Sequence, residues 1–173
     1  MKFVENPLIN KSTLLIAPYQ ITNDLTGSYV LENSTEYYTH LSPKQLIDKS
    51  CKYFGSSLQG RIEGTKEVFG ASRKPPISIE PLRGLYFLPT SSPNSENCVW
   101  LAHSHIDYLE KIKPKKTRVH FRSGRNFDVN VSHISLNNQI QRTAQYRHLL
   151  SERLLKNYEL ERLEINSPFE PVT

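Results

Sequence analysis

The sequence changes from a strand-like to a helix-like pattern at about Leu136, and this change limits the possible folds more than any other feature. Upstream of it, short β-prone runs alternate with turn residues. Downstream, apolar residues recur at helical spacing with no glycine or proline between them, which predicts one long helix that reaches about Leu163. Strands first and a helix last are typical of the α+β class. The expected apolar positions of this helix are Leu136, Ile140, Ala144, Leu150, Leu154 and Tyr158.

A shorter helix is predicted among the strands. Ser42 suits an N-cap, Pro43 suits the first helical position, and Gln45 completes a capping box. Gly55 suits the end of this helix. The predicted fold is therefore α+β, with a β-rich core of short antiparallel strands, one internal helix and a long C-terminal helix. The apolar stripe of the internal helix is expected at Leu46, Ile47, Cys51 and Phe54.

The most regular strand pattern is a predicted β-hairpin at residues 117–131. Val119 and Phe121 alternate with basic residues, so they are expected to share the buried face, and Ser123 and Gly124 are expected to form the turn. We expect one domain over residues 1–165 and a flexible tail over residues 166–173. The other expected strands span residues 12–19, 28–32, 34–40, 65–72, 77–80, 84–90 and 98–105.

The positive charge is concentrated in two blocks. The net charge is +5, and residues 41–75 hold seven cations and three anions, whereas residues 111–131 hold seven cations and one anion. If folding brings the blocks together, they form a basic face suited to nucleic acid. If it does not, they are ordinary solvated surface.

The first block contains a glycine-rich stretch over residues 51–68 that is predicted to be a loop. Glycine lets a backbone approach a ligand, and the neighbouring Lys52, Arg61 and Lys66 suggest a ligand that carries phosphate. Residues 55–61 read G-x-x-x-x-G-R, without the lysine and the following Ser or Thr of a P-loop. A nucleotide cradle is therefore excluded, and a nucleic-acid contact or a solvated loop remains.

A row of polar side chains opens the long helix. Asn138, Arg142 and Gln145 are spaced so that they share one face. These residue types read base edges or contact phosphates. The alternative is a plain amphipathic helix with a solvated polar side.

The sequence gives little support for catalysis or metal binding. His103 and His105 are expected on one face of a strand, where Cys98 or His120 could join them, but the spacing of a zinc site is missing. Cys51 falls on a predicted apolar stripe, where a thiol is usually inert. We predict no catalytic residue, no metal and no cofactor. No secretion signal or membrane span is found, so a cytoplasmic protein with both cysteines reduced is expected.

Several ordered motifs resemble the competence transcription factor (ComK) family. They are "SPKQLIDKSCKYFGSSLQGRIEGTKEV", "KPPI", "FLPT", "W-x-x-H-x-H" and "NQIQRTAQYR", and together they cover about residues 41–150. The resemblance implies an activator of DNA-uptake genes in a Gram-positive bacterium. It also implies dimers that assemble in pairs on paired A/T-rich boxes, bind largely through the minor groove and bend the DNA. An adaptor that delivers the protein to a Clp protease is a further implied partner.

We therefore predict a sequence-specific DNA-binding activator that is associated with the nucleoid when bound and is not an enzyme. The hairpin arginines Arg118, Arg122 and Arg125 are auxiliary candidates inferred from charge alone. Leu150, Leu154 and Tyr158 are expected either to contact another subunit or to cap the core. The predicted DNA contacts are Lys52, Arg61, Lys66, Arg73, Lys74, Asn138, Arg142, Gln145 and Arg147.

Two departures and two alternatives accompany this prediction. The last residues, "NSPFEPVT", lack the aromatic-rich adaptor motif associated with the family, and the family pattern does not ask for the basic hairpin. One alternative is a basic regulator that binds an acidic protein partner and no DNA. The second alternative function is a metal-dependent nuclease that uses His103, His105 and an acid such as Asp107.

Overall fold

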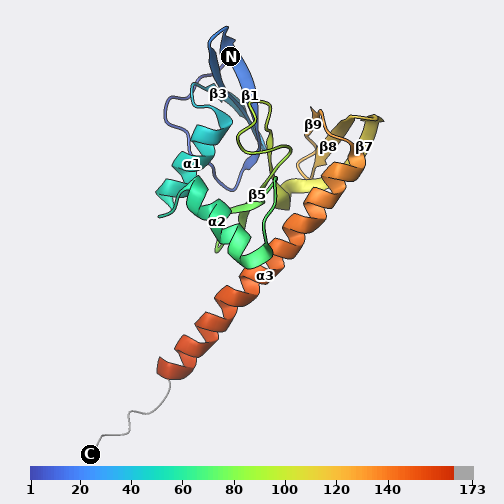
Figure 1. Ribbon diagram of the computed structural model, residues 1–173. Helices are drawn as coiled ribbons and strands as arrows, with labels where there is room; N and C mark the ends of the chain where they lie inside the picture. The colour runs from blue at the N-terminus through green and yellow to red at the C-terminus, as the bar shows by residue number, and fades with distance from the viewer. Residues whose placement is uncertain (166–173) are drawn as a thin grey trace, which may run out of the picture.

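The computed structural model describes residues 1–165 and consists of two antiparallel sheets and three α-helices over that range (Figure 1). One sheet has six strands in the order β3-β2-β1-β6-β5-β4, and the other has three in the order β7-β8-β9. The strands of the larger sheet are β1 Thr13–Thr22, β2 Leu25–Glu32, β3 Glu36–Thr39, β4 Ile77–Glu80, β5 Leu85–Pro89 and β6 Trp100–Ala102. Those of the smaller sheet are β7 Ile106–Lys113, β8 Lys116–Phe121 and β9 Asn126–Val129.

The helices are α1 Pro43–Tyr53, α2 Leu58–Phe69 and α3 His133–Ile165, and a short 3-10 turn, η1, spans His103–His105. The first half of α3 contacts α2, β5 and the small sheet, and its second half extends beyond the body of the protein (Figure 1). The α+β class is thus confirmed. The predicted tail over residues 166–173 lies outside the described residues. Within the described range, no helix has the length and apolar character to cross a bilayer.

The capping signals of α1 are confirmed. The Ser42 hydroxyl accepts a hydrogen bond from the Gln45 backbone N–H, and the Gln45 side chain accepts one from the Ser42 backbone N–H. At the other end, Gly55 has a φ of 81° and its N–H donates to the Lys52 carbonyl, while the Ser56 N–H donates to the Cys51 carbonyl. This is the Schellman arrangement that glycine favours.

The glycine-rich stretch is mostly a second internal helix, α2, so the predicted loop and the predicted strand at residues 65–72 are wrong. The Ser57 hydroxyl caps α2 by accepting from the Gly60 N–H. Leu58 and Thr65 are 3% and 0% exposed, and the Thr65 hydroxyl lies 2.6 Å from the Pro76 carbonyl oxygen. Packing and this buried hydrogen bond outweigh the cost of helical glycine, about 1 kcal/mol each.

The buried side of α3 agrees with the predicted stripe at Leu136 and differs from it further along the helix. Leu136 and Tyr146 are 1% and 2% exposed, and Gln139 and Thr143 are buried with them. Ala144, expected inside, is exposed. The Thr143 hydroxyl donates to the Gln139 carbonyl over 2.8 Å, which satisfies a buried polar group.

The hairpin predicted at residues 117–131 is confirmed as β8 and β9, with Val119 and Phe121 buried. Its connection is longer than the expected two residues and runs from Arg122 to Arg125, with Gly124 at a φ of 86°. Strand β7, which pairs with β8, was not predicted. Most of its side chains are exposed and many are charged, so it lacks a clear apolar alternation.

Candidate nucleic-acid interface

The polar row on α3 is exposed, as its spacing predicted. Asn138, Arg142 and Gln145 all face solvent on the first half of the helix. The Arg142 guanidinium lies over the Phe69 ring at the end of α2, 5.4 Å from the ring centroid. This contact holds the charge at the surface without neutralising it. Lys66 is exposed three residues before Phe69, so it lies beside the same contact.

The segment before β4 joins this surface at the start of α3. The Lys74 ammonium lies 3.5 Å from the Ser135 hydroxyl, and the Lys74 carbonyl accepts a 2.6 Å hydrogen bond from the Gln139 side chain. Arg73 lines a neighbouring cavity of about 600 Å³ that also includes Lys44 and Asp48. The structure therefore brings the polar row of α3 beside basic residues of the first charge block. We call Lys66, Arg73, Lys74, Asn138, Arg142 and Gln145 the α3 interface.

Three other predicted contacts have partners within the protein. Arg61 is half-buried and donates to the Ile79 carbonyl over 3.2 Å. Arg147 lies over the Tyr86 ring, 5.0 Å from its centroid, and lines a cavity of about 260 Å³. Lys52 is exposed on α1 and forms a 2.8 Å ion pair with Asp48. Each of these side chains therefore has a contact within the protein, and that of Lys52 is with an opposite charge.

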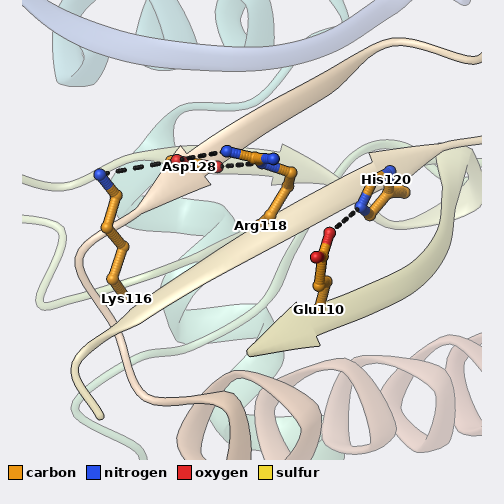
Figure 2. Close-up of polar contacts among 5 residues, drawn as sticks. All are labelled: Glu110, Lys116, Arg118, His120 and Asp128. Carbon is orange, nitrogen blue, oxygen red and sulfur yellow. Dashed lines mark hydrogen bonds and ion pairs between the residues drawn. The ribbon is translucent and has the colours of Figure 1, made fainter. Parts of the chain in front are cut away.

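Two of the three auxiliary arginines are also paired. Arg118 binds the Asp128 carboxylate through two nitrogens at 2.7 and 3.1 Å, and Lys116 approaches the same carboxylate at 3.6 Å (Figure 2). The Arg118 guanidinium holds the pKa of Asp128 below its usual range. Arg125 links the small sheet to β2 and β3, because it binds Glu36 and the carbonyls that precede β3. Arg122 is exposed, with no side-chain partner in residues 1–165.

The histidines do not form the arrangement that the metal hypothesis needs. His103 and His105 lie in η1 and not on one face of a strand. His105 Nε2 is 2.7 Å from the Lys11 carbonyl oxygen. His120 Nε2 is 2.8 Å from a Glu110 carboxylate oxygen (Figure 2). The His120 ring also stacks on that of Tyr108. Among residues 1–165, no three His, Cys, Asp or Glu side chains gather as metal ligands would.

Both cysteines are buried, free thiols. Burial raises the pKa of Cys51 to about 11 and raises that of Cys98 as well. A thiol with a raised pKa forms little of the reactive thiolate. Their interpretation as structural residues is consistent with this environment.

Sequence reasoning missed one basic feature, the turn between β7 and β8. Lys111, Lys113 and Lys115 are exposed there. The sequence held a signal for them, since "KIKPKK" places proline in a lysine-rich turn within the second basic block. The prediction attributed that block to the arginines of the following hairpin.

The architecture and the α3 interface define a class: an α+β protein that presents cations and amides of the types that contact phosphates and base edges. The chain belongs to the ComK protein family, whose model matches residues 4–155. It is 32% identical over 151 residues to the "Competence transcription factor" of Bacillus subtilis (strain 168), a match that covers 87% of this chain and 78% of the relative. No solved structure matches it significantly.

Proposed function

We propose that this protein is a transcription factor that activates competence genes by binding DNA. The observation that carries the proposal is membership of the ComK family over residues 4–155, supported by the 32% identity to a competence transcription factor. On this proposal residues 1–165 act as one DNA-binding unit without enzymatic activity. The protein works in the cytoplasm, on the nucleoid.

The α3 interface provides groups of the required chemistry. Arg142 and Lys74 supply positive charge for phosphates, and Asn138 and Gln145 supply amides that both donate and accept hydrogen bonds. We propose that these groups contact paired A/T-rich boxes, largely through the minor groove. The narrow groove of A/T tracts has an enhanced negative potential that attracts arginine and lysine.

The first experiment measures binding to two duplexes across a salt series, one with paired A/T boxes and one with the same bases shuffled. We expect a preference of about 10³ or more for the paired boxes and a steep loss of affinity with salt on both. Equal, feeble binding to both would favour a regulator that binds an acidic protein. Cleavage of either duplex that EDTA stops would favour a nuclease.

Arg142 gives a residue-level test of the interface. Arg142→Gln should weaken binding by about 1–3 kcal/mol, because it removes a charge from the centre of the exposed row. Lys2→Gln is the control for the loss of one charge, since Lys2 is exposed near the N-terminus and belongs neither to the α3 interface nor to the second half of α3. Equal affinities of the two variants would place the DNA elsewhere on the protein.

We also propose that the second half of α3 contacts a second copy of the chain. Leu154, Tyr158 and Ile165 continue the side of the helix that carries Leu150, and Tyr158 and Ile165 are 55% and 82% exposed. Residues 151–156 have a net charge of +1 and residues 157–165 of −2, so an antiparallel pair of helices brings opposite charges together. Such dimers would then assemble in pairs on DNA.

Sedimentation equilibrium tests the subunit contact. Tyr158→Glu should shift the protein toward the monomer, because it places a charge in the apolar stripe. Leu160→Glu is the matched control, since Leu160 is 59% exposed but lies on the other side of the helix. A wild-type protein that stays monomeric at all concentrations, with and without DNA, would contradict the proposal.

A further inference from the structure

The turn that joins β7 to β8 is the most positively charged short segment of the described structure. We define the hairpin tip as Lys111–Lys116, which contains four lysines, Ile112 and Pro114. No acidic residue occurs in the sequence between Glu110 and Asp128. We propose that the hairpin tip is a second DNA contact, an arm whose lysines bind the phosphates next to the site occupied by the α3 interface.

The lysines of the hairpin tip are available to a ligand. Lys111, Lys113 and Lys115 are exposed, and none of them forms an ion pair with an acidic side chain in residues 1–165. Lys116 has only a 3.6 Å contact with Asp128, a carboxylate that Arg118 already binds through two nitrogens (Figure 2). The charge of the tip is therefore not balanced within the protein.

The arrangement of these lysines is unfavourable for the isolated hairpin. Lys113 and Lys116 are directly opposite each other in the β7–β8 register, and like charges in that position destabilise a strand pair. Lysines on an edge strand can prevent pairing with another chain, and β7 is an edge strand. That role does not account for Lys115, which lies in the turn and has no strand edge to protect.

The hairpin tip lies at the same end of α3 as Lys74. The Thr117 hydroxyl, next to the tip, donates a 2.7 Å hydrogen bond to the carbonyl of Val131, just before α3 begins. Strands β7 and β8 both contact α3, and the hairpin runs outward beside the first turns of the helix (Figure 1). Lys74 contacts Ser135 in those same first turns.

The other turn of the small sheet, between β8 and β9, is held to the large sheet by one of its two arginines. Arg125, between β8 and β9, is bound to Glu36 and to the carbonyls of Glu32 and Thr35, so it fastens that turn to the large sheet. In the hairpin tip, Pro114 fixes one backbone dihedral of a two-residue connection. The β7–β8 turn is thus stiff, exposed and unpaired, as an arm that follows the DNA backbone needs to be.

This inference rests on the proposed function, and its test compares two variants that each lose two exposed lysines. Lys113→Gln with Lys115→Gln removes two proposed phosphate contacts. The salt slope, log Kd against log salt, should then decrease by about 1.8 for each bound copy of the protein, and affinity at roughly 0.1 M salt should fall about tenfold or more on matched and shuffled duplexes alike. Lys2→Gln with Lys11→Gln changes the net charge equally, and it should leave the slope unchanged.

The outcomes separate the two proposals. If the wild-type protein binds DNA and both double variants have its slope and affinity, the arm is wrong and the α3 interface stands. If both variants lose affinity equally, the effect is net charge and the arm is also wrong. If the wild-type protein binds neither duplex, the proposed function fails and the arm fails with it. Lys113→Arg with Lys115→Arg keeps both positive charges and should bind like wild type.

Cleavage of the DNA by a chelate attached to the hairpin tip locates the tip on the duplex without relying on its charge. Because Cys51 and Cys98 are buried, Lys115→Cys introduces an exposed thiol that can carry an iron chelate. We expect cuts at discrete places beside the A/T boxes, one for each bound copy of the protein. The same chelate on Lys2→Cys, an exposed position beside β3 and outside both proposed DNA contacts, should give weak and scattered cuts. Scattered cutting from residue 115 would overturn the proposal.

Discussion

In the first half of α3, Leu136 and Tyr146 are almost fully buried against the body of the protein, whereas in the second half Tyr158 and Leu163 are 55% and 69% exposed. Both halves are helical and both carry large apolar side chains at helical spacing. Helical periodicity therefore reports the conformation of a segment and does not report whether the protein itself covers the apolar side. The first half organises the α3 interface, and the second half is open to another molecule.

The largest expected difference between the halves is in stability. Leu136→Ala should lower the free energy of unfolding by about 2–5 kcal/mol, because it leaves a cavity where a 1% exposed side chain was packed. Leu160→Ala should change it by less than about 0.5 kcal/mol, since that side chain is 59% exposed. Urea unfolding at low protein concentration measures both. Equal losses would mean that the second half also packs on the body.

A smaller effect is expected at the hydrogen bond that joins the first half to the segment before β4. Gln139→Ala removes the donor to the Lys74 carbonyl and should cost about 1–2 kcal/mol of unfolding free energy. It should also weaken DNA binding, because Lys74 loses its fixed position. Gln145→Ala is the control, since Gln145 is exposed and its loss should affect binding without affecting stability. A loss of stability in both variants would contradict the assignment of a structural role to Gln139 and a purely binding role to Gln145.

The smallest expected effect concerns pH. Burial lowers the pKa of His103 below its usual value, and the positive charge of Arg147 on α3 lowers it further, with a lesser contribution from Arg122. Below about pH 6.5 the unfolded chain therefore binds more protons at this residue than the folded protein does, and stability falls as pH decreases toward the lowered pKa.

His103→Gln should remove part of this decrease. Urea unfolding at about pH 7.5 and about pH 5.5 gives the change for each protein, and we expect a smaller change in the variant than in wild type. Identical changes would show that the contact between η1 and the first half of α3 does not sense protonation of His103.

The fold was predictable where local sequence decides the structure. The capping box at Ser42 and Gln45 and the alternation through Val119 and Phe121 both correspond to observed elements. Helix α2 was not predictable from propensity, because Gly60 and Gly64 disfavour a helix that tertiary packing then stabilises. A strand such as β7, with few buried side chains, leaves no apolar alternation to detect.

The buried side of α3 was mispredicted beyond Leu136 for a related reason. Counting by four from Leu136 through Ile140 to Ala144 drifts around the helix, which has 3.6 residues per turn. The true buried side passes through Gln139 and Thr143, polar residues that are buried because each has a hydrogen-bond partner. Partners of this kind come from distant segments or from the helix backbone and are not visible in a polarity pattern.

The candidate site was also predictable only in part, because its contacts involve segments distant in the sequence. The residue types and the shared face of Asn138, Arg142 and Gln145 were predictable. Whether a given basic side chain is available to a ligand was not predictable, because this depends on contacts between segments distant in the sequence. Arg61 donates to the Ile79 carbonyl, and Arg125 binds Glu36. Sequence locates positive charge, and only the structure shows how much of it remains for a ligand.

The pairing of β1 with β6 also determines when the large sheet can be completed during synthesis. Leu15 and Ile16 pair with Leu101 and Trp100, so one edge of β1 has no partner until the ribosome has made the chain through β6. At roughly 5–20 residues per second, the delay between these partners is of the order of ten seconds. During that interval the nascent chain exposes an unpaired, apolar strand edge, the kind of surface that aggregates unless a chaperone covers it.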